Sequence, residues 1–251
     1  MSSQGRVTAW RVGIAVVVLG AWEGGVAAGA IDPFFLSRPS AITARVAAWI
    51  MSGTLWPHLW VTLEEALLGL AIGGVLGIAA GFALARAPLA ARVLDPYIAM
   101  LNAVPRVVLA PLFLLWFGLG IWSKIALAVT LVFFVMFFNT LQGVRDADRA
   151  LVNNVRMLGA SERQLVRHVL MPSALTWILS SLQSSLGLAM VGAVVGEYLG
   201  ATHGLGYMIA QAEGTFDTTG VFAGMTILSI VVVVTSAGVS RVERRLLRWK
   251  H

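Results

Sequence analysis

The feature that most constrains this chain is a set of apolar runs, each close to the length needed to cross a lipid bilayer. About 20 consecutive apolar residues span the hydrocarbon core as a helix, and residues 59–85 form one such run. Hydrophobic residues make up 58% of the 251-residue chain, above the roughly 45–50% of soluble domains. The sequence therefore predicts an all-α polytopic membrane protein, with residues 1–251 forming a single transmembrane domain.

About six spans are expected, at residues 10–30, 59–85, 93–117, 125–138, 172–198 and 221–239. The first run has a second interpretation as a cleaved signal peptide, because its basic start is followed by a cleavage-like Ala28, Gly29 and Ala30. We expect a retained helix. The C-terminal tail is cationic, and the positive-inside rule then places both termini in the cytoplasm. The cations of the tail are Arg241, Arg244, Arg245, Arg248 and Lys250.

The segment at residues 31–57 is expected to lie on the periplasmic side, between the first two spans. Within it, Ile42, Val46, Trp49 and Ile50 recur at the spacing of one helix face. A short helix with one apolar face is stable when it lies in the interface of the membrane. The sequence therefore predicts an interfacial helix here.

One long polar, cation-rich segment, residues 146–172, interrupts the apolar chain, and we call it the knuckle. Its apolar residues predict two short helices, at 147–158 and 162–170. Gly159 separates them and suits the left-handed conformation that ends a helix. Ser161 and Gln164 have the spacing of a capping box, and Pro172 is expected to stop the second helix. The basic residues of the outer faces are Arg145, Arg149, Arg156, Arg163, Arg167 and His168.

The order of residues in the knuckle resembles the EAA loop, the cytoplasmic coupling loop of permease subunits of bacterial ABC importers. The resemblance rests on Gly159-Ala160-Ser161, on Leu165 and on Leu170-Met171-Pro172. Asn153, Asn154 and Val155 stand where the family has Glu-Ala-Ala. Charge alone favours a simpler interpretation, a basic loop that only fixes topology. The coupling residues implied by the resemblance are Asn153, Asn154, Leu158, Gly159, Ala160, Ser161, Leu165 and Pro172.

Three further segments are similar to the nitrate, sulfonate and taurine permeases of that family. They are PRVVLAPLFLLWFGLG, FFVMFFNTLQGV and the glycine-rich GEYLGATHGLGYMI at residues 196–209. The resemblance implies a type I importer permease in the bacterial inner membrane, which forms a homodimer. It also implies two cytoplasmic ATPase subunits that bind ATP and Mg, a periplasmic binding protein, and alternating access for a small, anionic solute such as a sulfonate, taurine or nitrate.

Polar residues inside the spans are candidates for the translocation path, because charge at membrane depth is costly and often functional. Arg106 either contacts the solute or only braces the kink at Pro105. Glu197 belongs either to the path or to a structural ion pair. The remaining candidates are Asn139, Gln183 and Ser184. A separate row of small residues, Gly69, Gly73, Gly77 and Gly81, predicts close helix packing, inside the bundle or between subunits.

Several other classes of function are disfavoured. The chain has no cysteine, its four histidines are scattered without the spacing of metal ligands, and no phosphate-binding G-x-x-x-x-G-K-[ST] occurs. We therefore expect no metal or cofactor on this chain, and we expect ATP to bind elsewhere. The chain has a net charge of +6, and its arginines cluster beside the apolar spans. This placement argues against a nucleic-acid partner. A self-powered secondary transporter or channel is the alternative, and a membrane enzyme lacks a recognisable catalytic constellation.

Overall fold

The computed structural model describes residues 3–246, and within this range all of the regular structure is helical. Five helices are long and apolar enough to cross a membrane, and a bent pair adds a sixth if it counts as one span. The prediction of an all-α protein with about six spans is therefore confirmed. The long helices are α1 (Ser3–Ala27), α3 (Leu55–Ala85), α6 (Ile121–Arg145), α9 (Met171–Leu199) and α11 (Thr218–Leu246). The shorter elements are α2 (Pro39–Met51), α4 (Pro88–Ala103), η1 (Arg106–Leu109), α5 (Ala110–Phe117), α7 (Arg149–Met157), α8 (Glu162–Leu165), η2 (Val166–Leu170) and α10 (Leu205–Gly214).

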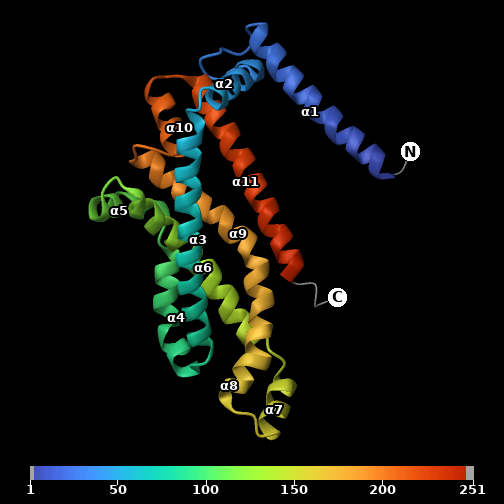
Figure 1. The fold of residues 1–251 in the computed structure, drawn as a ribbon, viewed down its shortest axis with the longest axis vertical. Helices are drawn as coiled ribbons and strands as arrows, with labels where there is room; N and C mark the ends of the chain where they lie inside the picture. Colours follow the sequence, from blue (N-terminus) through green and yellow to red (C-terminus); the bar gives the residue numbers. More distant parts are fainter. Residues whose placement is uncertain (1–2, 247–251) are drawn as a thin grey trace.

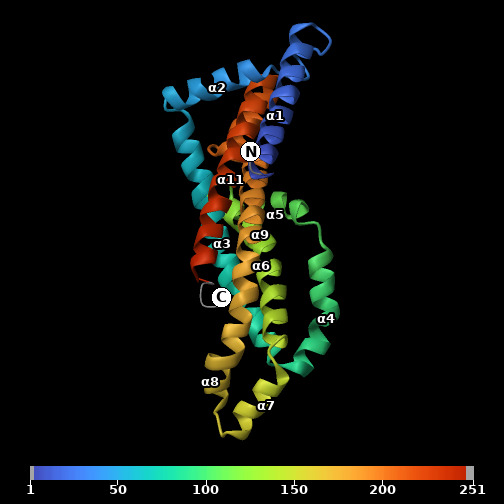
Figure 2. The same cartoon turned by 90° about the vertical axis from the view of Figure 1, so that its right-hand side faces the viewer.

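Three helices, α3, α6 and α9, form the centre of the molecule, and the other elements surround them (Figures 1 and 2). Their shared core contains Ala66 from α3, Val132 and Met136 from α6, and Met190 from α9, all at most 1% exposed. The knuckle, with α7 and α8, lies at one end of the bundle. The turn between α9 and α10 and the helix α2 lie at the other end, which we call the hairpin end.

The glycine row of α3 packs against α6 of the same chain. A Cβ atom at Gly73 would lie 2.9 Å from the Val129 carbonyl oxygen, and one at Gly69 would meet Ala128. Gly77 and Gly81 meet the next turns of α6 in the same way. The row therefore serves packing inside the bundle, where missing side chains let two backbones approach closely.

The third expected span is not one straight helix. α4 and the η1–α5 segment meet at a bend of 80°, immediately after Val104, which is extended with ψ of 124°. Proline disfavours helical geometry in the residue before it and has no N–H to donate, so Pro105 causes the break. Pro111 does not break α5, because it lies within the first turn, where a backbone donor is not needed.

Pro172 does not stop the second helix of the knuckle, so this prediction is wrong. The chain stays helical from Glu162 to Leu199, and a π-helical turn at Val166–Leu170 joins α8 to α9. Pro172 lies in the first turn of α9. In the π turn, the Met171 N–H donates to the Val166 carbonyl, five residues earlier. This shift in hydrogen-bond register just before the proline lets the helix continue although Pro172 has no N–H to donate.

The outer elements close the hairpin end of the bundle. α10 packs between α9 and α11, and α2 crosses the end of α11 (Figure 1). α1 leaves this end and runs away from the bundle. Glu23 of α1 accepts hydrogen bonds from the backbone N–H and hydroxyl of Ser40, at 3.0 and 2.8 Å, and so caps the start of α2. Arg248 and Lys250 of the expected cationic tail lie outside the described residues.

Candidate functional site

The knuckle is built on two capped helices joined by a tight glycine turn. Asp148, which the sequence analysis missed, caps α7 by accepting the Ala150 N–H at 2.7 Å. Gly159 has φ of +81°, as its place after α7 predicts. The capping box is also confirmed: Ser161 Oγ accepts the Gln164 N–H at 3.4 Å, and Gln164 Oε1 accepts the Ser161 N–H at 2.8 Å.

Glu162 ties the knuckle to the rest of the bundle. Its carboxylate lies 3.3 Å from the guanidinium of Arg86, where α3 ends, and 3.2 Å from that of Arg156 in α7. These exposed ion pairs contribute little to stability individually, on the order of 0.2–1 kcal/mol. Their effect is geometric, because one carboxylate links α8, α7 and the end of α3.

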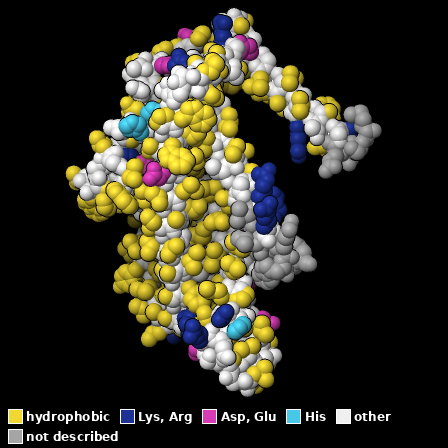
Figure 3. Space-filling view, viewed as in Figure 1, with side chains coloured by type: hydrophobic (Ala, Val, Ile, Leu, Met, Phe, Trp, Pro, Cys, Tyr) yellow, Lys and Arg dark blue, Asp and Glu magenta, His cyan; other side chains and the backbone are white. Residues whose placement is uncertain are grey.

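The tip of the knuckle exposes an apolar surface to solvent. Met157 is 81% exposed, Leu158 is 86% exposed and Leu151 is 47% exposed. Cationic side chains gather near this end of the molecule, at the lower part of Figure 3. An exposed apolar patch with a charged rim is typical of a protein–protein interface. Met157 was not among the expected coupling residues, although it is adjacent in sequence to Leu158, which was expected.

A groove of about 350 Å³ runs beside the tip, between the end of α6, α7 and the start of α9. Its wall is held by Ser173 Oγ, which donates to the Gly143 carbonyl at 2.8 Å, and by Trp177 Nε1, which donates to Asp146 at 3.4 Å. Pro172 and His168 also line the groove. The knuckle therefore presents both a convex apolar tip and an adjacent groove.

The predicted coupling residues divide into exposed and buried positions. Asn153, Asn154, Gly159 and Ser161 are exposed, and Ala160 and Pro172 are half-buried. Leu165 is only 1% exposed. It anchors α8 in the fold, so any effect it has on a partner passes through the position of α8.

The predicted path residues do not converge on one site. Arg106 lies at the bend after α4, donates to the Asn102 carbonyl at 2.7 Å and to the Val104 carbonyl, and stacks over Phe134 with its Cζ 4.5 Å from the ring centroid. Asn139 donates to the Val135 carbonyl within α6. Gln183 accepts from Ser240 of α11, and Ser184 donates to the Ser181 carbonyl one turn earlier in α9.

Glu197 lies at the hairpin end, near two charged residues that the sequence analysis did not single out. It is 1% exposed, and so is Glu65 of α3, while Lys124 of α6 is fully buried. Only the fold brings these three helices together. The adjacent glutamate, Glu64, is exposed, and no local sequence pattern shows which of the two glutamates is buried.

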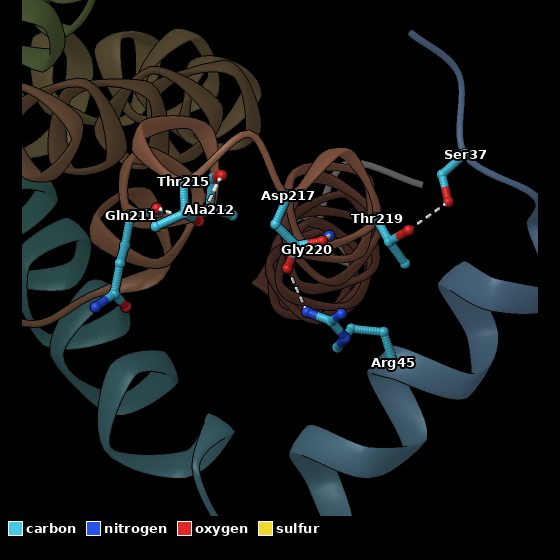
Figure 4. Close-up of polar contacts among 8 residues, drawn as sticks. All are labelled: Ser37, Arg45, Gln211, Ala212, Thr215, Asp217, Thr219 and Gly220. Atoms are coloured by element: carbon cyan, nitrogen blue, oxygen red, sulfur yellow. Dashed lines mark hydrogen bonds and ion pairs between the residues drawn. The ribbon is translucent and has the colours of Figure 1, made fainter. Parts of the chain in front are cut away.

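A second polar cluster joins α2 to the turn before α11 (Figure 4). Arg45 of α2 lies 2.5 Å from the carboxylate of Asp217, and Ser37 shares a 2.7 Å hydrogen bond with Thr219. Asp217 also accepts the Gly220 N–H at 3.0 Å. These contacts fix α2 across the hairpin end. No group of three His, Cys, Asp or Glu side chains in residues 3–246 is arranged to hold a metal ion.

The sequence matches a known protein family over most of its length. Residues 73–248 match the family described as "Binding-protein-dependent transport system inner membrane component". The chain is 35% identical over 246 residues to the SsuC permease of Bacillus subtilis (strain 168), named for aliphatic sulfonate transport, with 96% of this chain and 88% of that protein covered.

Two further relatives are named for other solutes. The formylaminopyrimidine transport permease protein ThiX of Halalkalibacterium halodurans is 36% identical over 219 residues, which cover 87% of each chain. The taurine transport system permease protein TauC of Escherichia coli (strain K12) is 31% identical over 249 residues, which cover 97% of this chain and 90% of that one.

Solved structures share the fold at low sequence identity. A chain of the MetNI methionine ABC transporter, in an inward facing conformation, superposes with a TM-score of 0.69 at 20% identity, over 78% of this chain and 99% of that one. A chain of an amino acid ABC transporter superposes with a TM-score of 0.60 at 21% identity, over 87% of this chain and 98% of that one.

Proposed function

Because this chain belongs to the family of binding-protein-dependent transport system inner membrane components, and is therefore a permease subunit of an ABC importer and not an enzyme, we propose that the knuckle is where a separate ATPase drives it. The observation that carries this proposal is the exposed apolar tip at Met157 and Leu158. It stands on a scaffold that is capped, ion-paired and continuous with a membrane-spanning helix.

The proposed cycle is alternating access by a pair of permease copies. Two ATPase subunits, which carry ATP and Mg, receive one knuckle each and approach one another when ATP binds. Glu162 and the capping box keep α7 and α8 together during this movement, so the knuckle moves as a unit. The displacement passes into α9 without a flexible link, because the chain remains helical from Glu162 onward.

The proposed placement is the bacterial inner membrane, with the knuckle and both chain termini in the cytoplasm. The hairpin end then faces the periplasm, where a binding protein delivers the solute. In this placement α2 lies in the outer interface, held by Arg45 and Asp217. The fold supports the arrangement, because the turn between α3 and α4 and the knuckle lie at one end while α2 and the α9–α10 turn lie at the other.

The proposed solute is a small sulfonate. Two of the relatives described above are named for aliphatic sulfonates and for taurine, and both align over nearly the whole of this chain. In such a system the binding protein supplies most of the selectivity, while the permease provides the path. This proposal is tested by measuring solute uptake in cells that express the complete system, with ethanesulfonate, taurine or nitrate added as a competitor. The two sulfonates are expected to compete. Uptake with which neither ethanesulfonate nor taurine competes contradicts the proposal, even where nitrate competes.

The docking proposal is tested by placing a charge on the apolar tip. Met157→Asp is expected to weaken recovery of the ATPase with the purified permease about tenfold, since loss of one well-buried interface contact costs about 1.4 kcal/mol or more. Met51→Asp is the matched control, because Met51 is also 81% exposed but lies at the hairpin end. Equal ATPase recovery with both variants, measured by quantitative mass spectrometry, would contradict a docking role for the tip.

A further inference from the structure

A pocket of about 390 Å³ opens between the first turns of α4 and the end of α6, at the same end of the bundle as the knuckle. Its lining consists of Pro88, Ala91, Arg92 and Asp95 from α4 and of Arg145, the last residue of α6. Ala91 is 7% exposed and lies at the base of the pocket. The three charged side chains are exposed and form its rim. α4 stands away from the centre of the bundle (Figure 2), which leaves room for this pocket.

The charged side chains of the rim have no partner within the part of the chain that the structure describes. The ion pairs of residues 3–246 involve other side chains, and no hydrogen bond joins Arg92, Asp95 or Arg145 to a described residue. Arg92 and Asp95 are three positions apart and so lie on one face of α4. Two positive charges and one negative charge therefore border the same space, free to contact a ligand.

The pocket lies where a membrane span ends. Arg145 closes the 25-residue helix α6, which is long and apolar enough to cross a membrane, and arginine at the end of a span reaches the headgroup region. Leu141 and Phe138 precede Arg145 by four and seven residues, on the same helix face. Phe138 is 39% exposed, and Ala99, one turn after Asp95, is exposed as well. The surface between the pocket and the membrane centre is therefore apolar.

The pocket also offers acceptors for a positively charged group. Asp95 supplies a carboxylate. Pro96, inside α4, has no N–H, so the carbonyl of Arg92, four residues earlier, lacks its ordinary helical donor. A simple anion would meet the two guanidinium groups, but the Asp95 carboxylate would repel it. A group that carries both a phosphate and an ammonium matches all three charges.

We propose that this pocket binds the headgroup of a phosphatidylethanolamine molecule. The phosphate accepts hydrogen bonds from Arg92 and Arg145, whose planar guanidinium groups suit phosphate oxygens. The ammonium donates to the Asp95 carboxylate and to the Arg92 carbonyl, and the acyl chains lie along the apolar surface beside Phe138. The lipid joins α4 to the end of α6, whereas α4 otherwise packs mainly against α3. This role does not depend on the solute.

The test is a lipid titration by native mass spectrometry. The full-length permease is purified in mild detergent with the subunits that remain bound to it, and its co-purified lipid is removed. Dioleoyl forms of phosphatidylethanolamine, phosphatidylcholine and phosphatidylglycerol are then added separately. One phosphatidylethanolamine per permease copy is expected to bind about tenfold more tightly than either other lipid, because choline has no N–H to donate and glycerol has no positive charge.

Two outcomes with the wild-type protein overturn the proposal, whether or not any variant folds. One is equal binding of the three lipids, which indicates a nonspecific lipid shell. The other is tighter binding of phosphatidylglycerol, which indicates a site for net negative charge.

Variants at the rim locate the lipid. Arg145→Gln is expected to weaken phosphatidylethanolamine binding about tenfold, since it removes a charge-assisted hydrogen bond. Arg241→Gln is the matched control, because Arg241 is an exposed arginine near the end of α11 that does not line the pocket. Equal effects of the two substitutions contradict the proposed site.

Asp95→Asn tests the part of the site that recognises the ammonium. It is expected to abolish the preference for phosphatidylethanolamine over phosphatidylglycerol, because the carboxylate that attracts one headgroup and repels the other is gone. An unchanged preference contradicts the proposal. Inorganic phosphate and phosphoethanolamine, at the lipid's own concentration, are expected not to displace the lipid, since they lack acyl chains. Displacement by either would identify a soluble phosphate as the occupant and overturn the assignment to a lipid.

Discussion

At the scale of single residues, Gly159 sets the angle between the two helices of the knuckle. Its φ of +81° costs a residue with a side chain about 1–2 kcal/mol, and a β-branched residue more. Gly159→Val is therefore expected to leave membrane insertion intact and to uncouple ATP hydrolysis from transport, because α7 changes its direction. Proteoliposomes that contain the complete importer allow both rates to be measured.

Gly53 provides a matched control for this substitution. It has φ of +80°, and a Cβ atom there meets nothing within 4 Å, as at Gly159. Gly53→Val at the hairpin end therefore carries a similar backbone cost without touching the knuckle. If both variants transport solute at the wild-type ratio of solute to ATP, Gly159 has no role in coupling.

Arg106 is a second residue whose role is testable. Its guanidinium donates to the Asn102 and Val104 carbonyls, which the bend at Pro105 leaves without helical partners, and also to the Asn102 side chain. Arg106→Gln is therefore expected to lower stability by about 1–3 kcal/mol and to leave the KM for uptake unchanged. A large rise in KM with an unaltered unfolding temperature would instead show that Arg106 contacts the solute.

At the scale of secondary-structure elements, the packing of α3 on α6 depends on which glycines face the partner helix. A Cβ atom at Gly77 would lie 2.9 Å from Met136 Cβ and closer still to the Phe133 carbonyl, whereas one at Gly74 meets nothing within 4 Å. Gly77→Ala should destabilise the permease by about 1–3 kcal/mol. Gly74→Ala should be neutral or stabilise by up to about 1 kcal/mol through helix propensity. Thermal unfolding of both variants checks the contrast, and equal shifts would contradict this packing.

The elements that the sequence predicts well are those specified by local chemistry. Gly159 and the pair Ser161 and Gln164 mark the knuckle because turns and caps depend on neighbours in sequence. The continuation of the helix through Pro172 escapes prediction, because a π turn has no clear sequence signal. The approach of Glu65 and Lys124 to Glu197 also escapes it, since these residues come from three helices and only tertiary packing brings them together.

At the scale of the whole molecule, the permease is expected to work as part of a larger assembly. Purification of the tagged chain from native membranes in mild detergent should yield two copies of this 26.7 kDa subunit and two copies of a Walker-type ATPase. Native mass spectrometry measures this ratio directly. An isolated chain that transports solute into vesicles without ATP would contradict both the assembly and the role of the knuckle.

The unbroken helix from Glu162 to Leu199 has a mechanical consequence. Its 38 residues follow a bent path (Figure 1) of at most about 57 Å at 1.5 Å per residue. If this helix tilts by about 5° around the knuckle, its far end travels up to about 5 Å, which is comparable to the width of a small solute. The far end bears Glu197, which accepts the Gly206 N–H at 2.7 Å and so anchors the α9–α10 turn. In the proposed placement, a slight rotation imposed by an ATPase would thus become a larger displacement of the α9–α10 turn on the opposite face of the membrane.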